Sequence, residues 1–337
     1  MTKANWTRIT TDESIKRSSQ TVTVLGDDVF IYGGELRPRE PVDSAIHRVS
    51  VKQEGTSDTT ITQITDLPNA PQPRVGAAST ALNGNIYIFS GRGGVAMAPV
   101  EENGAFWVFD PSGEWSQVKP VHGQAPYPAG RSYHALTNDG KDTIFLHAGC
   151  PENGRLRDFW SFNVTTRIWA ELPPVPGPER GGPSIAYSEG KLYRMNGFDG
   201  KTEQGGALDV FDLETNTWST ITYPADGING PAARSVSALL ALEINGKPSV
   251  VTLFGEHDPS SLGHQGAGKM LSDVWVFDIQ TQAWKTVGID SDSVPPPRGW
   301  FDADVITTGQ SQGLVVHGGL AESNERLGDI WLLEFEI

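Results

Sequence analysis

Short apolar runs that end in glycine recur along the chain, and the positions within and after them alternate between apolar and polar. The runs cover residues 30–34, 88–91, 145–149, 193–197, 251–255 and 315–319. Their final glycines lie 57, 58, 48, 58 and 64 residues apart. Alternation with a period of two residues, in β-branched and aromatic runs between Gly, Asn and Pro turns, predicts strands. No stretch keeps apolar residues at helical spacing for a dozen positions, so we predict an all-β fold.

Each repeat carries two further marks. An arginine precedes the final glycine by 17 to 21 residues, at Arg17, Arg74, Arg131, Arg180, Arg234 and Arg298. An alternating aromatic strand follows the glycine, as in 158–162 and 273–278, and four repeats end with Trp115, Trp169, Trp218 or Trp284. Four short antiparallel strands in 50 to 60 residues predict one blade of a β-propeller, and six copies predict six blades.

The two ends of the chain complete one another in this scheme. The third strand of the last repeat, 329–334, ends almost at the C-terminus, which leaves no residues for a fourth strand. The N-terminal segment 5–9 matches 217–221, the fourth strand of another repeat. We therefore predict that residues near 5–10 form the outer strand of the last blade and close the ring without a free sheet edge. Residues 1–337 would then form a single propeller domain.

The net charge and the cysteine content limit the cellular compartment and the binding partners that we expect for this protein. The chain has 26 Lys and Arg against 41 Asp and Glu, a formal charge of −15. Such an acidic protein is a poor ligand for nucleic acid or for an anionic membrane. Cys150, the only cysteine, cannot form an internal disulfide, and the N-terminus shows no secretion signal. We expect a cytoplasmic protein with no membrane-spanning segment.

The strand order brings the arginines and the loops after the glycines to one end of the central channel. Because antiparallel strands alternate in direction, the first strand of a blade begins where the second ends. A cationic mouth on an acidic protein would select a small anion. We expect Arg74 and Arg131 to grip that anion. Arg17, Arg180, Arg234 and Arg298 are further candidates for substrate binding. The alternative is that these arginines bind neighbouring backbone carbonyls and join blade to blade.

The loop of the fifth repeat, 255–268, contains the densest group of candidate metal ligands. Glu256, His257, Asp258 and His264 place two carboxylates and two imidazoles within nine residues. Carboxylate and imidazole ligands with open positions are suited to iron(II). The alternative is a solvated loop that happens to carry charges.

Several of these segments together resemble one known family. They are Glu256, His264-x-Gly266-x-Gly268, 298–300, 316–319 and 196–200. The paired glycines and spaced tryptophans resemble the kelch repeat, and this set is similar to the plant specifier proteins, the nitrile-specifier, epithiospecifier and thiocyanate-forming proteins. The resemblance implies action on the sulfated aglucones that myrosinase releases from glucosinolates. The products would be nitriles, epithionitriles or thiocyanates instead of isothiocyanates, formed by a lyase-like protein with non-haem iron(II).

The family's iron motif, Glu-x-x-x-Asp-x-x-x-His, is only partly present here. Glu256 and His264 match its ends, but Ser260 occupies the middle position, and a hydroxyl is a weaker iron ligand than a carboxylate. Asp258 or His257 could substitute by a shift of the loop, or the metal could be bound weakly or lost.

The resemblance also assigns the remaining site residues. Arg74 and Arg131 resemble the family's sulfate-binding arginines, Trp300 resembles the tryptophan that lines its pocket, and Phe198 would add an apolar wall. Two other functions stay open. One is a non-catalytic kelch module that binds an acidic peptide at the same mouth. The other is an enzyme of microbial secondary metabolism that keeps this fold with a different anionic substrate.

Overall fold

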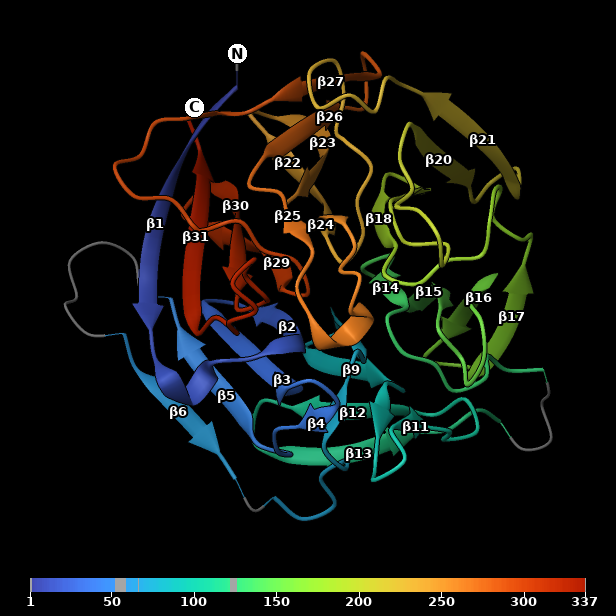
Figure 1. Ribbon diagram of the computed structural model, residues 1–337. Coiled ribbons are helices and arrows are strands. Elements are labelled where there is room, and N and C mark those ends of the chain that lie inside the picture. The colour runs from blue at the N-terminus through green and yellow to red at the C-terminus, as the bar shows by residue number, and fades with distance from the viewer. Residues whose placement is uncertain (1, 52–58, 66, 122–125, 337) are drawn as a thin grey trace.

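The computed structural model describes residues 2–51, 59–65, 67–121 and 126–336. The predicted all-β fold is confirmed there, since only two 3-10 helices, η1 (Glu13–Ile15) and η2 (Gly263–Gln265), interrupt the strands. Neither helix in this part of the chain is long and apolar enough to cross a membrane. Figure 1 shows the sheets arranged around a common centre.

In the described residues, six sheets each contain an antiparallel run of four strands; the strands pair in the order of the sequence, except that β1 pairs with β31 in the last sheet. The first three comprise β2 (Ser18–Leu25), β3 (Asp28–Arg37), β5 (Ile46–Ser50) and β6 (Ile61–Ile64); β8 (Ala78–Leu82), β9 (Asn85–Phe89), β12 (Phe106–Asp110) and β13 (Glu114–Val118); and β14 (Ala135–Asn138), β15 (Thr143–Gly149), β16 (Leu156–Asn163) and β17 (Ile168–Leu172). The next two comprise β18 (Ser184–Ser188), β19 (Lys191–Met195), β20 (Ala207–Asp212) and β21 (Thr217–Thr222); and β22 (Ala238–Ile244), β23 (Lys247–Leu253), β26 (Val274–Asp278) and β27 (Ala283–Thr286). The sixth comprises β29 (Asp302–Thr308), β30 (Ser311–His317), β31 (Asp329–Phe335) and β1 (Lys3–Thr11).

The remaining strands are short and lie mainly in the loops between second and third strands. They are β4 (Glu40–Pro41), β7 (Arg74–Val75), β10 (Arg92–Gly93), β11 (Ala98–Pro99), β24 (Glu256–Asp258), β25 (Lys269–Met270) and β28 (Gly288–Ile289). In Figure 1 the first strands, such as β2, β18, β22 and β29, lie near the centre, and β1, β6, β17 and β21 lie at the periphery.

The N-terminal strand β1 is the outer partner of the last strand, β31. The two run antiparallel, with Asn5 opposite Glu334 and Trp6 opposite Leu333. Trp6 is buried; its ring stacks on Phe254 at 5.8 Å and meets the Trp331 ring edge-on at 6.5 Å. The first residues of the chain are therefore packed into the core between the fifth and sixth sheets.

Within the described ranges, the hydrophobic core consists of six clusters, and each cluster joins two neighbouring sheets. For example, one cluster packs Phe106 of the second sheet against Phe162 of the third, and another packs Ile31 of the first against Ile330 of the sixth. The other four join the first to the second, the third to the fourth, the fourth to the fifth and the fifth to the sixth. Every sheet thus buries apolar side chains on both of its faces.

A cycle of six backbone hydrogen bonds links the sheets close to the axis. Each bond runs from the N–H two residues after one repeat arginine to the carbonyl at the same position of the preceding repeat, over 2.7 to 3.1 Å. The six positions are Ser19, Gly76, Tyr133, Gly182, Val236 and Trp300. All six have φ between 45° and 61°, in the left-handed region that a β-branched residue such as Val236 rarely adopts. At Gly76 a Cβ would also lie 2.9 Å from the Tyr133 ring.

The packing of β1 leads to a test of the Trp6 contact. The substitution Trp6→Ala should lower the free energy of unfolding by about 3–5 kcal/mol, because it removes a buried indole between two sheets. Urea denaturation measures the effect. The control is Thr7→Ala, an exposed change in the same strand that should cost less than about 0.5 kcal/mol. Equal effects of the two variants would contradict the observed docking of β1.

Candidate functional site

The six repeat arginines lie inside the sheets, and none is more than 5% exposed. Each Nη1 donates a hydrogen bond of 2.9 to 3.1 Å to the carbonyl that precedes the repeat's final glycine. The acceptors belong to Gly33, Ser90, Ala148, Asn196, Phe254 and Gly318. This bond fixes the start of the first strand to the end of the second within each repeat.

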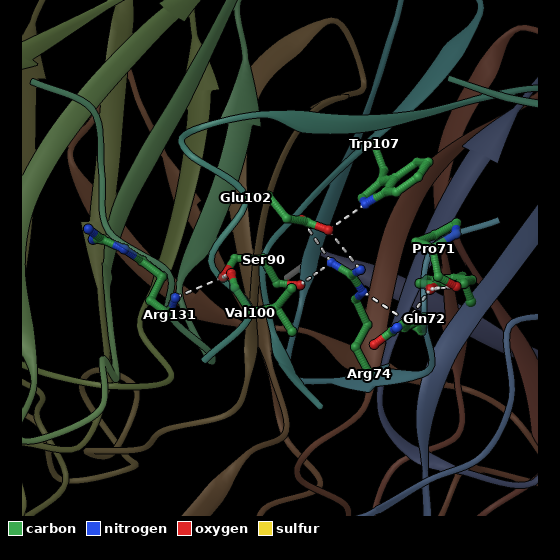
Figure 2. Close-up of polar contacts among 9 residues, drawn as sticks. Pro71, Gln72, Arg74, Ser90, Val100, Glu102, Trp107 and Arg131 are labelled. Atoms are coloured by element: carbon green, nitrogen blue, oxygen red, sulfur yellow. Dashed lines mark hydrogen bonds and ion pairs between the residues drawn. The ribbon is translucent and has the colours of Figure 1, made fainter. Parts of the chain in front are cut away.

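In four repeats the arginine also forms a two-bond ion pair with a carboxylate. Arg74 pairs with Glu102, and Arg131, Arg234 and Arg298 pair with Asp158, Asp273 and Asp329. A tryptophan indole donates to the same carboxylate in each case, at 2.6 to 2.7 Å. Figure 2 shows this arrangement for Arg74, with Glu102 held between its guanidinium and Trp107. These guanidinium groups already hold an internal anion.

Within the described residues, Arg17 and Arg180 form no such ion pair; Ala45 and Ala207 occupy the position that Asp158 has in the third repeat, and no acid from elsewhere in the loop replaces it as Glu102 does in the second repeat. Arg17 contacts His47 Nε2 at 3.0 Å instead. Burial lowers the pKa of Arg180 to about 10, and the charges of Asp209 and Asp199 act in the opposite direction. In all six repeats the arginine has a structural role that its spacing in the sequence reflects.

The side chains that surround the mouth come from a different repeat position, the residue directly after the final glycine. The six residues there are Glu35, Arg92, Cys150, Phe198, Glu256 and Leu320. All six pair through the backbone with the residue after the repeat arginine, for example Cys150 with Ser132 and Glu256 with Ser235. They therefore lie next to the hydrogen-bonded cycle, at the end of the channel where we expected the site.

On one side of the mouth the charged side chains have protein partners. Glu35 forms a buried ion pair with Arg326 at 3.1 Å. Arg92 donates Nε to the Ser132 hydroxyl at 2.9 Å and Nη1 to the Met97 carbonyl at 3.0 Å, and it contacts the Pro151 carbonyl through Nη2. These groups connect neighbouring loops.

Arg155 lies on the other side and differs from every repeat arginine. Its guanidinium carbon is 5.0 Å from the centre of the Phe198 ring, a cation–π contact. Its Nε is covered from solvent and has no hydrogen-bond partner, and no ion pair to Arg155 occurs among the described residues. A Cβ at Gly200 would lie 2.7 Å from its Nη1, so a larger residue there would shift the end of this side chain. Arg155 lies outside the repeat spacing, so no pattern in the sequence singled it out.

Two carboxyl groups share this side of the mouth. Burial raises the pKa of Glu256 to about 7, against hydrogen bonds from the Gly268 N–H and the Trp300 side chain. Burial raises the pKa of Glu203 to about 8, and the nearby charge of Glu256 adds to this effect. Glu203 also bridges to Phe198 through the backbone. Glu203, like Arg155, stands outside every repeated motif of the sequence.

Two aromatic rings meet beneath the mouth. Tyr133 of the third repeat and Trp300 of the sixth lie edge to face with their centres 5.2 Å apart, and the Tyr133 hydroxyl is 3.5 Å from that of Ser19. Both residues also line a cavity of about 410 Å³ bounded by the first strands of all six sheets. The predicted pocket residue Trp300 thus lies at the boundary between the mouth and this channel.

The predicted metal residues are only partly brought together. Glu256 is 5% exposed and its Oε1 accepts from the Gly268 N–H at 2.9 Å, while Asp258 is exposed. The Ser260 hydroxyl accepts from the Leu262 N–H at 3.1 Å within its own turn. The His264 side chain lies outside the described part. Within that part, no group of three or more His, Cys, Asp or Glu side chains is placed to hold a metal ion.

Comparison with known proteins identifies the family to which this chain belongs. The KLHDC2/KLHL20/DRC7 Kelch-repeats domain matches residues 19–255. The chain is a kelch-repeat protein. The solved structure of YjhT has the same fold, with a TM-score of 0.71 and 15% identity over 96% of this chain and 98% of that one.

Two curated relatives illustrate the range of this family. N-(sulfonatooxy)prop-2-enimidothioate sulfolyase of Thlaspi arvense is 26% identical over 94% of this chain and 91% of its own length. This relative confirms the resemblance to the specifier proteins. Kelch-like protein terF of Aspergillus terreus is 25% identical over 90% of this chain, which spans 61% of that protein.

The buried ion pairs lead to a stability test. Asp329→Ala leaves the Arg298 guanidinium buried and without its carboxylate, and this should cost about 3–5 kcal/mol of unfolding free energy at pH 7. Glu325→Ala, which breaks the exposed pair with Lys16, should cost under about 1 kcal/mol. Urea denaturation compares the two.

The pH dependence of the same variant supplies a second readout. Burial alone would raise the pKa of Asp329, but the Arg298 guanidinium holds it below its usual value. The carboxylate therefore stabilises the fold above the unfolded pKa of about 4, and that contribution is lost as the pH falls through the folded pKa. The difference between wild type and Asp329→Ala should narrow below pH 4. A difference that stays constant would contradict the ion pair.

Proposed function

We propose that this kelch protein acts on a small organic sulfate at the mouth of the propeller, as its specifier-type relative does on a sulfonatooxy compound. The observation that carries the proposal is the Arg155 guanidinium, which lies against Phe198 at the mouth and forms no ion pair within the described residues, although the Glu203 carboxyl is close enough for the two charges to interact. Guanidinium binds sulfate through paired, charge-assisted hydrogen bonds. Phe198 and Trp300 would provide apolar surface for the substrate's side chain.

The proposal replaces two of the expected contacts. Arg74 and Arg131 were expected to grip the anion, but Glu102 and Asp158 already occupy their guanidinium groups. Arg17, Arg180, Arg234 and Arg298 are equally buried. An organic sulfate would have to displace a buried carboxylate or carbonyl to reach any of them, whereas Arg155 requires no such exchange.

The chemistry follows from the class of substrate. In an N-(sulfonatooxy) imidothioate the N–O bond breaks and both bonding electrons leave with sulfate. The remaining atoms form a thiocyanate when the substrate's side chain moves from carbon to sulfur, or a nitrile when the carbon–sulfur bond also breaks and the sulfur atom is released. Negative charge grows on the departing sulfate oxygen, and Arg155 would stabilise it where it develops. Iron(II) held at Glu256 would supply a Lewis acid toward the substrate's sulfur or nitrogen.

We also propose that the six sheets are the six blades of one closed propeller formed by the whole chain. The cycle of hydrogen bonds near the axis returns to its first member, and apolar clusters join every neighbouring pair of sheets, including the sixth and the first. The pairing of β1 with β31 supports closure by the N-terminal strand.

A binding module without catalysis is the second candidate. The family match and relatives such as Kelch-like protein terF support it. Two large apolar side chains in loops that follow second strands, Val95 and Leu262, are exposed as well. An acidic peptide could bind the same Arg155 guanidinium. The two candidate functions therefore share the anion contact, and they differ in whether the bound molecule is converted to a product.

Product analysis with myrosinase and a glucosinolate tests the enzymatic proposal. With the iron(II)-supplied protein, nitrile or thiocyanate should form at the expense of isothiocyanate. Arg155→Ala should lower this diversion about 100-fold or more, because a donor to the developing anion is lost. Arg155→Lys should retain part of it.

The control is Arg157→Ala, an exposed arginine two residues further along, which should leave the products unchanged. Absence of diversion by the wild-type protein would overturn the enzymatic proposal. Unchanged diversion by Arg155→Ala would remove Arg155 from it. Saturable binding of an acidic peptide without any change in products would favour the binding module.

A further inference from the structure

The arginine of the fourth repeat keeps the posture of its counterparts but has no carboxylate to bind. In the third repeat Asp158 accepts from Nη1 and Nη2 of Arg131 at 2.7 and 2.9 Å and from the Trp160 indole at 2.7 Å. Ala207 has the position of that acid in the fourth repeat. Arg180 still donates Nε to the carbonyl two residues earlier and Nη1 to the carbonyl before the final glycine, as Arg131 does. The Arg180 Nη2 is therefore directed to the place of the acid, and it donates no hydrogen bond within the described residues.

A second buried arginine, Arg194 of β19, lies on the same face of this sheet. Asp209 stands at the position of the indole that contacts the acid in the third repeat, and Arg194 is its direct partner on the neighbouring strand. Arg194 donates Nη1 to Asp209 Oδ2 at 2.7 Å and Nε to His147 Nε2 at 3.0 Å. Its Nη2 is covered from solvent and has no hydrogen-bond partner. Two guanidinium groups thus each leave one Nη2 without an acceptor.

The charges buried here do not balance. Arg180 and Arg194 carry two positive charges and Asp209 carries one negative charge, and none of the three is more than 5% exposed. Burial keeps the pKa of His147 well below its ordinary value, so its imidazole is neutral. Asp199 acts on Arg180 through its charge but forms no ion pair with it in the described part of the chain. An uncompensated buried charge is costly, and one monovalent anion would cancel it.

The first repeat also lacks the acid, but its arginine has other acceptors. Ala45 has the acid's position there, and Arg17 donates Nη2 to the Ser14 carbonyl at 2.9 Å and contacts His47 Nε2 at 3.0 Å. In the remaining four repeats Nη2 binds a carboxylate. Among the six repeat arginines in the described residues, Arg180 is therefore the one whose Nη2 has no acceptor.

We propose that one chloride ion binds between Arg180 and Arg194, in the place that Asp158 has in the third repeat. A monovalent anion matches the excess of one positive charge, and guanidinium groups hold anions by charge-assisted hydrogen bonds. Ala207 is half-buried, so a small ion can reach this place from solvent, whereas no polar group remains there for a larger one. The ion would connect the second and third strands of the fourth repeat. This site uses none of the residues of the proposed function.

Unfolding by urea at different chloride concentrations tests the site in solution. Gluconate replaces chloride, so that the ionic strength stays at about 0.15 M. Each tenfold rise in chloride above the dissociation constant should raise the free energy of unfolding by about 1.4 kcal/mol, because the ion binds the folded state. Crystals soaked in bromide should show one anomalous peak within hydrogen-bond distance of both Nη2 atoms.

Two variants make the result specific. Ala207→Asp returns a carboxylate to Arg180, so it should abolish the dependence on chloride and the bromide peak. Ala170→Asp adds the same charge at an exposed position of β17 and should change neither. The proposal is overturned if the stability of the wild type does not depend on chloride, or if no bromide lies between Arg180 and Arg194. It is also overturned if Ala207→Asp responds to chloride as the wild type does.

Discussion

The architecture depends on a cycle of six backbone hydrogen bonds around the axis and on the buried arginine that precedes each member of that cycle. The cycle requires left-handed backbone at six positions, including Val236 and Trp300, where this conformation is unfavourable. The arginine two residues earlier holds the strand start by bonds to the carbonyl beside the final glycine. The cost of the left-handed backbone at these six positions is thus offset by buried hydrogen bonds within each repeat.

Because the arginine and the cycle of hydrogen bonds fix the backbone, the side chain after each final glycine is free to vary. The backbone of this residue pairs with the residue after the repeat arginine, and its side chain takes no part in the hydrogen bonds of the cycle. Glu35 and Arg92 use that freedom to connect loops, whereas Phe198 and Glu256 face Arg155 and Glu203. A symmetric fold therefore carries a site on one side only, built by the third, fourth and fifth repeats.

The sequence pattern was sufficient for the strands and for the pairing of β1, because both depend on repeated local signals such as the final glycine and the spaced tryptophan. It was not sufficient for the role of the arginines. Their periodic spacing looked like a ring of anion ligands, yet the acids that neutralise them occur at different distances along the chain: Asp158 follows Arg131 by 27 residues, whereas Asp273 follows Arg234 by 39. Arg155 and Glu203 lie outside the repeat, so only the folded structure brings them together.

The central claim is that the repeat arginines are structural and that Arg155 alone among the arginines discussed receives the sulfate of a substrate. Anomalous diffraction from crystals soaked in selenate, a heavier analogue of sulfate, tests this most directly. The account predicts a selenium peak within hydrogen-bond distance of the Arg155 guanidinium, above Phe198, and intact pairs at Arg74 and Arg131. A selenium peak at Arg74 or Arg131, with Glu102 or Asp158 displaced and no peak at Arg155, would contradict it.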